Sequence, residues 1–328
     1  MIRHIQWLEW RSILAVQPII RSKLVTFGSS AMKTMPLPVL RLVFLGLTVL
    51  GINACSTVSP GLSTESIQKL VTAPDRTPAD LTNDQRRMPE KMLAFMGVRP
   101  GMLALDLFAG GGYTTELLAR AIGPTGKVFG QSQPPNPTLA PPAAPEGNSN
   151  PSAGSSAAAA TSPPPAAPPA APPVRVPSSV ALAQRQQRMQ AAGVSAAPIV
   201  AIVQKFETPI PEGMSDQKLD FVSLMFNYHD LGHMRVDRQA MNRAIFQALK
   251  PGGLYLVSDH AGRPGTGISE AGTLHRIEEA FLRQEIESAG FKFVAEGGFL
   301  RNPNDPRDKN TPNPPQPKDD FVLKFIKP

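Results

Sequence analysis

Cysteine is almost absent from this chain of 328 residues, which contains a single one, Cys55. One cysteine excludes an intramolecular disulfide and any zinc site that is built from several thiolates. The apolar run over 42–52 has eleven uncharged residues. That is short of the about 20 residues that a bilayer-spanning helix needs, so this run does not predict a membrane span.

Basic residues exceed acidic ones at the start of the chain. The formal net charge is +7, and residues 1–54 hold six basic residues and one acid. The remaining residues hold 27 basic and 25 acidic side chains. Because this larger part is nearly balanced, it offers no broad phosphate-binding surface, and we expect no nucleic-acid partner.

The run over 42–52 is typical of the apolar core of a secretion signal, which is about 7 to 15 residues long and follows basic residues. Lys33 and Arg41 precede the run. We therefore predict a signal peptide over 1–54. A second hydrophobic stretch lies upstream, over 1–31, so translation is expected to start at one of the two methionines that follow it, Met32 or Met35.

Residues 52–55, with the sequence INAC, resemble the bacterial lipobox, in which the cysteine is lipidated and becomes the first residue of the mature protein. The resemblance implies a lipid anchor on Cys55. It places the protein on the periplasmic side of the bacterial envelope, attached to a membrane by several acyl chains. Ordinary cleavage without a lipid, and no export, are the alternatives.

Proline is about twice as frequent as in an average protein, with 36 residues of 328 against a usual share of about 5 %. Fifteen of these prolines lie in 134–177, and most other residues there are alanine, serine, asparagine or glycine. Such a segment cannot bury enough apolar surface to offset its ordering entropy. We predict a disordered insertion over 134–177, a polar tether over 55–80, and one folded domain over 81–328 that contains the insertion.

Strand and helix patterns alternate on both sides of this insertion. Helices are predicted over 82–96, 114–122, 180–192, 238–249 and 274–288. Strands are predicted over 102–108, from 127, and over 199–204, 220–226, 254–258, 292–296 and 321–326. This alternation indicates an α/β domain with a parallel sheet covered on both faces. Ligands bind such a sheet at the carboxyl ends of its strands.

A glycine-rich loop follows the first predicted strand. Asp106 lies near the end of that strand, and 110–112 are three glycines before the next helix. Glycines let a backbone approach a ligand closely, and the helix amides that follow face it. The spacing does not fit the dinucleotide fingerprint, which would require glycine at Thr115, so an NAD-dependent oxidoreductase is not favoured. A methyltransferase-type loop, another nucleotide site and a structural turn remain open from the loop alone.

Several motifs together resemble class I S-adenosylmethionine methyltransferases. The loop matches their D-x-G-x-G-x-G pattern at Asp106, Gly110 and Gly112, with Phe108 in place of the first glycine. The other matching segments are GVRPGMLALDLFAGGGYTTELLARAIGPTGKV, NYHDL, LKPGGLYLVSDHA, TLHRIE and DDFVLKFIKP. The chain thereby resembles a bacterial family of predicted methyltransferases, many with export signals, over roughly 80–132 and 180–328.

The resemblance implies a Rossmann-like fold with a seven-stranded, mostly parallel sheet whose last strand is antiparallel. It implies S-adenosylmethionine as cofactor and a methyl acceptor that is a small molecule or an envelope component. The cofactor-binding residues would be Asp106, Phe108, Ala109, Gly110, Gly111, Gly112, Tyr113 and Asn227. The alternative is a noncatalytic lipoprotein that uses the fold as a ligand-binding or interaction module. Gln131, Phe108 and the predicted export favour this alternative. Class I enzymes usually carry an acidic ribose-binding residue at the position of Gln131 and a glycine at that of Phe108.

Methyl transfer mainly requires alignment of the reacting atoms, and a base only for protonated or weakly acidic acceptors. His229 and His260 follow predicted strands and are candidate general bases, with Asp230 or Asp259 orienting them. The predicted catalytic residues are therefore His229, Asp230 and His260. Helix capping and ordinary polar contacts are the alternative for each histidine.

A metal site is a competing use of the same groups. His229 and His233 are four residues apart, and Asp259, His260 and His275 are possible further ligands. Gly232 makes a helix through the first two histidines doubtful. On this ground the sequence predicts no metal site.

Overall fold

The computed structural model describes residues 61–134, 176–211, 213, 214, 216, 218–310 and 316–328. The predicted signal peptide, the lipobox with Cys55 and residues 135–175 of the predicted insertion lie outside them. Among the described residues, no helix combines the length and the apolar character that crossing a membrane requires.

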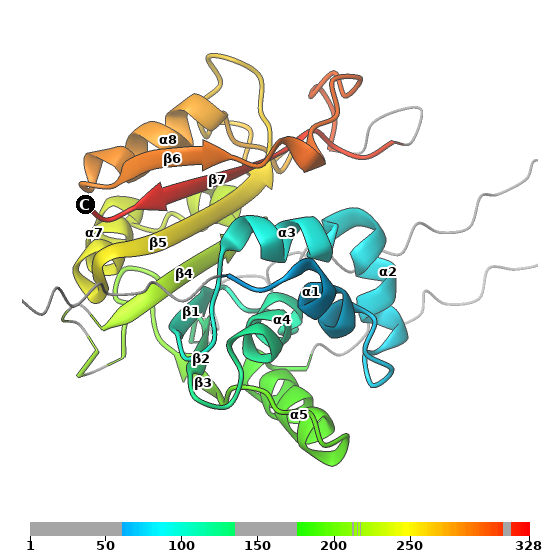
Figure 1. The fold of residues 1–328 in the computed structure, drawn as a ribbon. Coiled ribbons are helices and arrows are strands. Elements are labelled where there is room, and N and C mark those ends of the chain that lie inside the picture. Colours follow the sequence, from blue (N-terminus) through cyan, green and yellow to red (C-terminus); the bar gives the residue numbers. More distant parts are fainter. Residues whose placement is uncertain (1–60, 135–175, 212, 215, 217, 311–315) are drawn as a thin grey trace, which may run out of the picture. The chain divides into compact units, whose positions relative to one another are not determined.

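A seven-stranded sheet forms the centre of the fold (Figure 1). Its strands are β1 (Leu103–Leu107), β2 (Lys127–Ser132), β3 (Ile199–Val203), β4 (Leu219–Met225), β5 (Leu249–His260), β6 (Lys292–Glu296) and β7 (Asp320–Ile326). Their order is β3-β2-β1-β4-β5-β7-β6, and β7 runs antiparallel to both of its neighbours. This topology confirms the predicted mostly parallel sheet with an antiparallel last strand. The strand order reverses between β1 and β4, the place where α/β sheets bind ligands.

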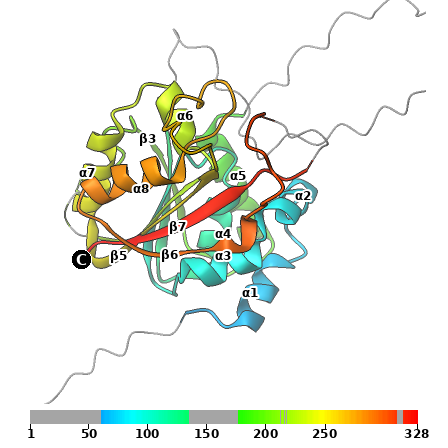
Figure 2. The same cartoon turned by 90° about the horizontal axis from the view of Figure 1, so that it is seen from above.

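Helices cover both faces of the sheet (Figure 2). One face carries α1 (Thr64–Val71), α3 (Pro89–Met96) and α4 (Tyr113–Ile122), and the other carries α7 (Arg238–Ala248) and α8 (Glu279–Ser288). Two clusters of buried apolar side chains lie between the sheet and these helices. Because β1 and β4 are covered on both faces, their sequences LALDL and LDFVSLM are nearly continuous apolar runs.

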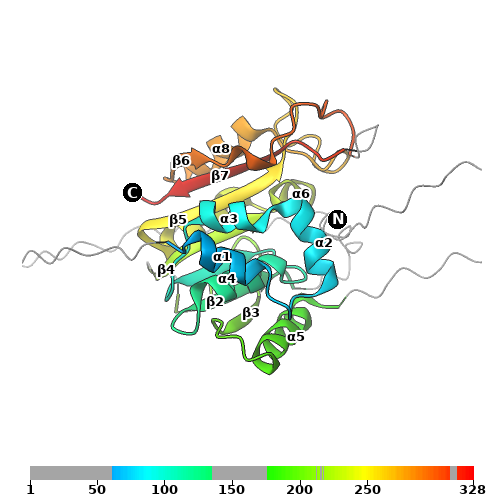
Figure 3. The same cartoon turned by 45° about the vertical axis from the view of Figure 1, so that its right-hand side comes forward.

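Two further helices lie at the carboxyl ends of the parallel strands (Figure 3). They are α2 (Pro78–Arg87) and α6 (Tyr228–His233). The helix α6 forms although Gly232 makes a helix through His229 and His233 doubtful in the sequence. A glycine is tolerated at position 232 because a Cβ there would lie 2.4 Å from Cδ1 of Ile268, so the absence of a side chain permits close packing.

Proline divides the helix that the sequence predicts over 82–96. The helix α2 ends at Arg87, Met88 adopts a left-handed φ of 44°, and α3 begins at Pro89. Proline is accepted at the first position of a helix, since the amide it lacks has no partner there. The tether expected over 55–80 does not hold for 61–80, where α1 buries Ile67 and Val71.

The predicted helix over 274–288 begins later than expected, at Glu279. Residues before it are held by other bonds: the amide of Ile277 donates to His260 O (3.0 Å), and Arg276 is fully buried in an ion pair with Asp305 (2.8 Å). His275 adopts a left-handed φ of 51°. The segment therefore runs beside the end of β5 instead of forming a helical turn.

The helix α5 (Ser178–Ala191) follows the insertion and packs along β2 and β3, next to α4. A buried ion network attaches it. Glu116 on α4 is 2 % exposed in its side chain and lies 2.6 Å from Arg185, 2.5 Å from Arg188 and 2.8 Å from Arg120. Arg185 also pairs with Asp80 of α2 (2.8 Å). These pairs hold α5 against the elements that carry the glycine loop.

Candidate functional site

The glycine loop connects β1 to α4 at the point where the strand order reverses. Phe108, Gly110 and Gly112 have φ values of 55°, 53° and 78°. The amide of Ala109 donates to Gln131 O (2.9 Å), and the amide of Gly112 donates to Ala109 O (2.8 Å). The loop is therefore a defined turn with several left-handed residues, and this backbone conformation favours glycine at positions 110 and 112.

Asp106 lies beneath this loop. The residue is 2 % exposed, and its carboxylate accepts hydrogen bonds from Thr115 Oγ1 (2.6 Å) and Ser223 Oγ (2.8 Å). Burial raises the pKa of Asp106 to about 6, although these hydrogen bonds oppose the shift. The carboxylate thus joins the end of β1 to the first turn of α4 and to β4, and supports the loop from inside the core.

Gln131 stands at the end of β2, where class I methyltransferases carry an acidic residue. Its Oε1 accepts the amide of Phe108 (3.1 Å), and its Nε2 donates to Gln204 O (2.6 Å). The residue is fully buried. Both ends of the side-chain amide therefore hold the protein's own backbone, which commits this side chain to fixing the loop.

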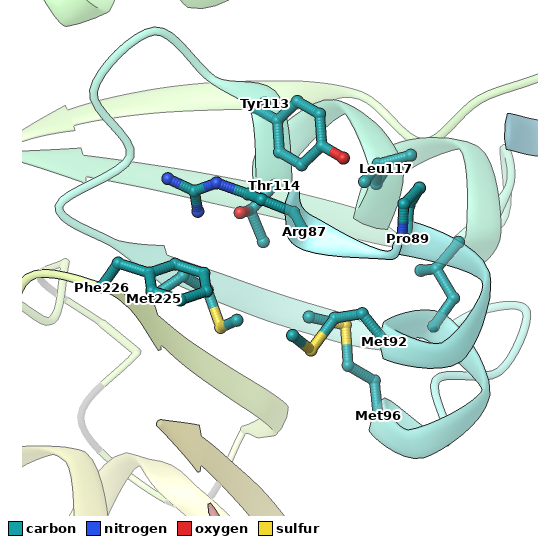
Figure 4. A pocket seen from close by; sticks show the side chains of 10 residues that line it. Arg87, Pro89, Met92, Met96, Tyr113, Thr114, Leu117, Met225 and Phe226 are labelled. Atoms are coloured by element: carbon teal, nitrogen blue, oxygen red, sulfur yellow. The ribbon is translucent and has the colours of Figure 1, made fainter. Parts of the chain in front are cut away.

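A small pocket lies beside the loop, between α2, α3, α4 and the end of β4 (Figure 4). The side chain of Arg87 extends between the rings of Tyr113 and Phe226, at 5.6 and 4.3 Å from their centroids. Its Nε is buried without a hydrogen-bond partner, and within the described residues Arg87 forms no ion pair. Burial lowers the pKa of Arg87 to about 10, which leaves the group cationic at neutral pH.

The groups around this pocket fit the amino-acid end of S-adenosylmethionine. Arg87 offers an unpaired cation to a carboxylate, and the N-cap residue of α4, Gly112, provides no side-chain cap for the first amides of that helix. The pocket encloses about 10 Å³, the room of about one water molecule. A ligand of the cofactor's size therefore enters only when Arg87 or its neighbours move.

A second group of polar side chains lies where β4 and β5 end. His229 Nδ1 is 2.6 Å from Asp259 Oδ1, and His229 Nε2 is 3.3 Å from Asp230 Oδ1. Burial disfavours the charged ring, but Asp259 and Asp230 outweigh it and raise the pKa of His229 to about 10. In this state the imidazole is a proton donor, so His229 is poorly suited to act as a general base at neutral pH.

His260, at the end of β5, has a different partner. Its Nδ1 lies 2.6 Å from Asp320 Oδ1 on β7, and its ring is 5.7 Å from those of His229 and Phe226. Phe226 lines the small pocket, so His260 is the histidine next to it. Asp259, which the sequence offers as a partner for either histidine, bonds the ring of His229.

Some of the predicted catalytic and cofactor-binding residues lie close together in the structure, and others do not. Asp230, His229 and His260 are neighbours, and Asn227 donates to Asp230 Oδ2 (3.0 Å). Tyr228, which follows Asn227, is instead fully buried, and its hydroxyl bonds Glu285 and Asn242. Among the predicted loop residues, Tyr113 lines the small pocket together with Phe226. The site thus has a glycine-loop part and a histidine part.

Two residues of the site have no role in the sequence analysis. Arg87 is one of two adjacent arginines near a helix end, a position where basic residues usually face solvent. Asp320 is separated from His260 by 60 residues, and only the pairing of β5 with β7 brings them together. Neither contact has a local sequence signal.

No protein-family model and no curated protein sequence matches the chain. Solved structures resemble it in fold. A SAM-dependent methyltransferase from Aquifex aeolicus is 16 % identical, with 81 % of this chain and all of that chain covered and a TM-score of 0.45. A putative methyltransferase in a complex with the Haloferax volcanii Trm112 activator is 15 % identical (76 % and 92 %, TM-score 0.44). The [4+2]-cyclase SpnF is 14 % identical (76 % and 79 %, TM-score 0.43). The likeness is confined to the fold.

Proposed function

We propose that this chain is an S-adenosylmethionine-dependent methyltransferase. The observation that carries the proposal is the partly buried guanidinium of Arg87, which has no ion pair among the described residues and lies beside a left-handed glycine loop where the strand order reverses. A carboxylate is the group that such a cation and the adjacent helix N-terminus would bind. The methionine end of the cofactor would therefore lie against Arg87 and the loop from Phe108 to Tyr113.

The cofactor, when bound, supplies an electrophilic methyl group on its sulfonium. The residues of this chain would position it and exchange protons with the acceptor. His260 is placed for this exchange because it lies next to Phe226 and is oriented by Asp320. We propose a small molecule or an envelope component as the acceptor.

The noncatalytic alternative rests on Gln131. Its amide is committed to Phe108 and Gln204, so the site has no free carboxylate at the usual ribose-binding position. A binding module would hold S-adenosylmethionine or a related ligand without consuming it. Incubation of the protein with the cofactor and candidate acceptors, followed by measurement of S-adenosylhomocysteine, separates the two functions.

The role of Arg87 is tested by Arg87→Met, which keeps an apolar stem of similar length and removes the charge. We expect the affinity for S-adenosylmethionine, measured by calorimetric titration, to fall about 10- to 100-fold, because a hydrogen bond to a charged group contributes about 1.5–3 kcal/mol. Lys91→Met, on the exposed side of α3, removes the same charge outside the pocket and should leave the affinity unchanged. Equal affinities in both variants and the wild type would contradict the assignment.

We further propose that the protein is exported and anchored through Cys55. The support is the apolar run over 42–52 and the lipobox-like INAC that ends at this cysteine. In bacterial cells, Cys55→Ser should shift the full chain from the membrane fraction to the soluble fraction or leave it unprocessed. Membrane attachment and electrophoretic mobility identical to those of the wild type would exclude lipidation at this residue.

A further inference from the structure

Histidine is scarce in this chain, yet it is concentrated at one place. Four of the five histidines lie between positions 229 and 275, and the rings of His260 and His275 lie 5.7 and 5.4 Å from that of His229. In the described part of the chain, His229, Asp230 and His275 each offer one ligand atom, and these three atoms lie within 4.8 Å of one another. The proposed methyl transfer uses no metal ion, so this grouping calls for a separate explanation.

The orientation of His229 leaves one ring nitrogen available. Its Nδ1 is 2.6 Å from Asp259, a fully buried carboxylate that also accepts the backbone amides of His229 (2.7 Å) and His260 (2.8 Å). With the ring fixed in this way, Nε2 points toward Asp230. The side chain is 1 % exposed, and Nε2 has no hydrogen-bond partner among the described residues. A carboxylate on one nitrogen of a histidine, with the other nitrogen facing a second potential ligand, Asp230 (3.3 Å), is an arrangement found at metal ligands.

The two separations that involve Asp230 are close to those between ligands of a small divalent cation. Asp230 Oδ1 lies 3.3 Å from His229 Nε2 and 3.6 Å from His275 Nδ1. Two ligands at about 2.0–2.1 Å from a tetrahedral ion are separated by about 3.3–3.4 Å. The second oxygen of Asp230 accepts a hydrogen bond from Asn227 (3.0 Å), which orients the carboxylate.

His275 is presented by a rigid segment. Its neighbour Arg276 is fully buried and bonds Asp305 (2.8 Å) and the carbonyl of Ala261 (3.0 Å). On the other side of Arg276, Ile277 is tied to the end of β5. These bonds hold His275 in its left-handed conformation, which is strained for a residue with a side chain. The ligand is therefore positioned before any ion arrives.

We propose that His229, Asp230 and His275 bind a divalent transition-metal cation with the ligand preferences of Zn²⁺. Two imidazoles and one carboxylate are a complete set of protein ligands for an ion that keeps a further position open. Asp230 and His275 are partly exposed, so this open position faces solvent and would accept water or an oxygen of a substrate.

The full chain, freed of metal by a chelator and dialysed, is titrated with Zn²⁺ alone in competition with a chromophoric chelator. We expect one equivalent to bind to the wild type. His275→Ala removes a ligand from a surface segment and should weaken binding by at least about 100-fold, and Asp230→Asn should also weaken it. Co²⁺ in place of Zn²⁺ should give the visible absorption of a four- or five-coordinate ion in the wild type, and this band should be lost in His275→Ala.

His233→Ala is the matched control, since His233 lies one turn beyond His229 on the same helix and outside the group of three. It should bind Zn²⁺ as the wild type does. Absence of a stoichiometric site in the wild type, or equal affinity in the wild type and His275→Ala, would overturn the proposal. Far-UV circular dichroism confirms that each variant is folded, and none of these readouts depends on S-adenosylmethionine.

Discussion

Gly110→Val is expected to reduce the affinity for S-adenosylmethionine by at least about 100-fold while the far-UV circular dichroism stays native. Gly110 has a φ of 53°, a conformation that a β-branched residue rarely adopts. The loop is fixed on both sides of it, by the bond from Phe108 to Gln131 and by the bond from Gly112 to Ala109. The loop must therefore rearrange locally at a cost of about 1–3 kcal/mol, and the new side chain adds a steric conflict with the ligand.

Gly123→Val separates backbone strain from loss of the site. Gly123 ends α4 with a φ of 67°, and a Cβ there would meet no atom within 4 Å. This variant carries the same substitution at a left-handed glycine, outside the site, so we expect some loss of thermal stability and an unchanged affinity. If Gly110→Val binds the cofactor as tightly as Gly123→Val, the loop is only a structural turn.

Glu116→Gln is expected to lower the free energy of unfolding by about 3–5 kcal/mol. The carboxylate is buried and pairs with Arg120, Arg185 and Arg188. Glutamine keeps the shape of the side chain but removes its negative charge. The positive charges of these guanidinium groups are then less fully balanced in an environment with little water. Because Arg185 also bonds the carbonyl of Gly111, we expect α5 and the glycine loop to loosen together. Denaturation by urea, followed by circular dichroism, measures the change.

Glu65→Gln provides the reference for an exposed pair. Glu65 and Lys69 are 2.7 Å apart on α1, but both side chains are more than 70 % exposed. Such a pair contributes less than about 1 kcal/mol, so this variant should unfold nearly as the wild type does. Similar small losses in both variants would show that the network of Glu116 does not attach α5.

The alternation of strands and helices follows from patterns that the sequence carries locally, whereas the antiparallel last strand is expected from the family resemblance. The apolar runs of β1, β4 and β7 and the glycines after β1 are visible in the sequence, and they predict the architecture and the loop. The errors occur where a tertiary contact overrides the local pattern. Residues 274–278 have a helical pattern, but the buried pair of Arg276 with Asp305 holds them beside β5.

The site was less predictable than the fold because its partners are distant in the sequence. Asp230 and His275 approach to 3.6 Å from positions 45 residues apart. The sequence predicts no metal site because Gly232 makes a helix through His229 and His233 doubtful. The grouping of His229, Asp230 and His275 depends instead on the path of the chain after β5, which brings His275 close to Asp230. Arg87 is recognised as a candidate binding residue only from the structure, because its position between the rings of Tyr113 and Phe226 has no sequence signal.

Calorimetric titration of the folded full chain with S-adenosylmethionine, and separately with S-adenosylhomocysteine, tests most directly whether the loop after β1 is a cofactor site. The predicted result is saturable binding of one equivalent that Gly110→Val abolishes and Arg87→Met weakens. Absence of binding by the wild-type protein at millimolar ligand, with a native circular dichroism spectrum, would contradict the proposed methyltransferase function.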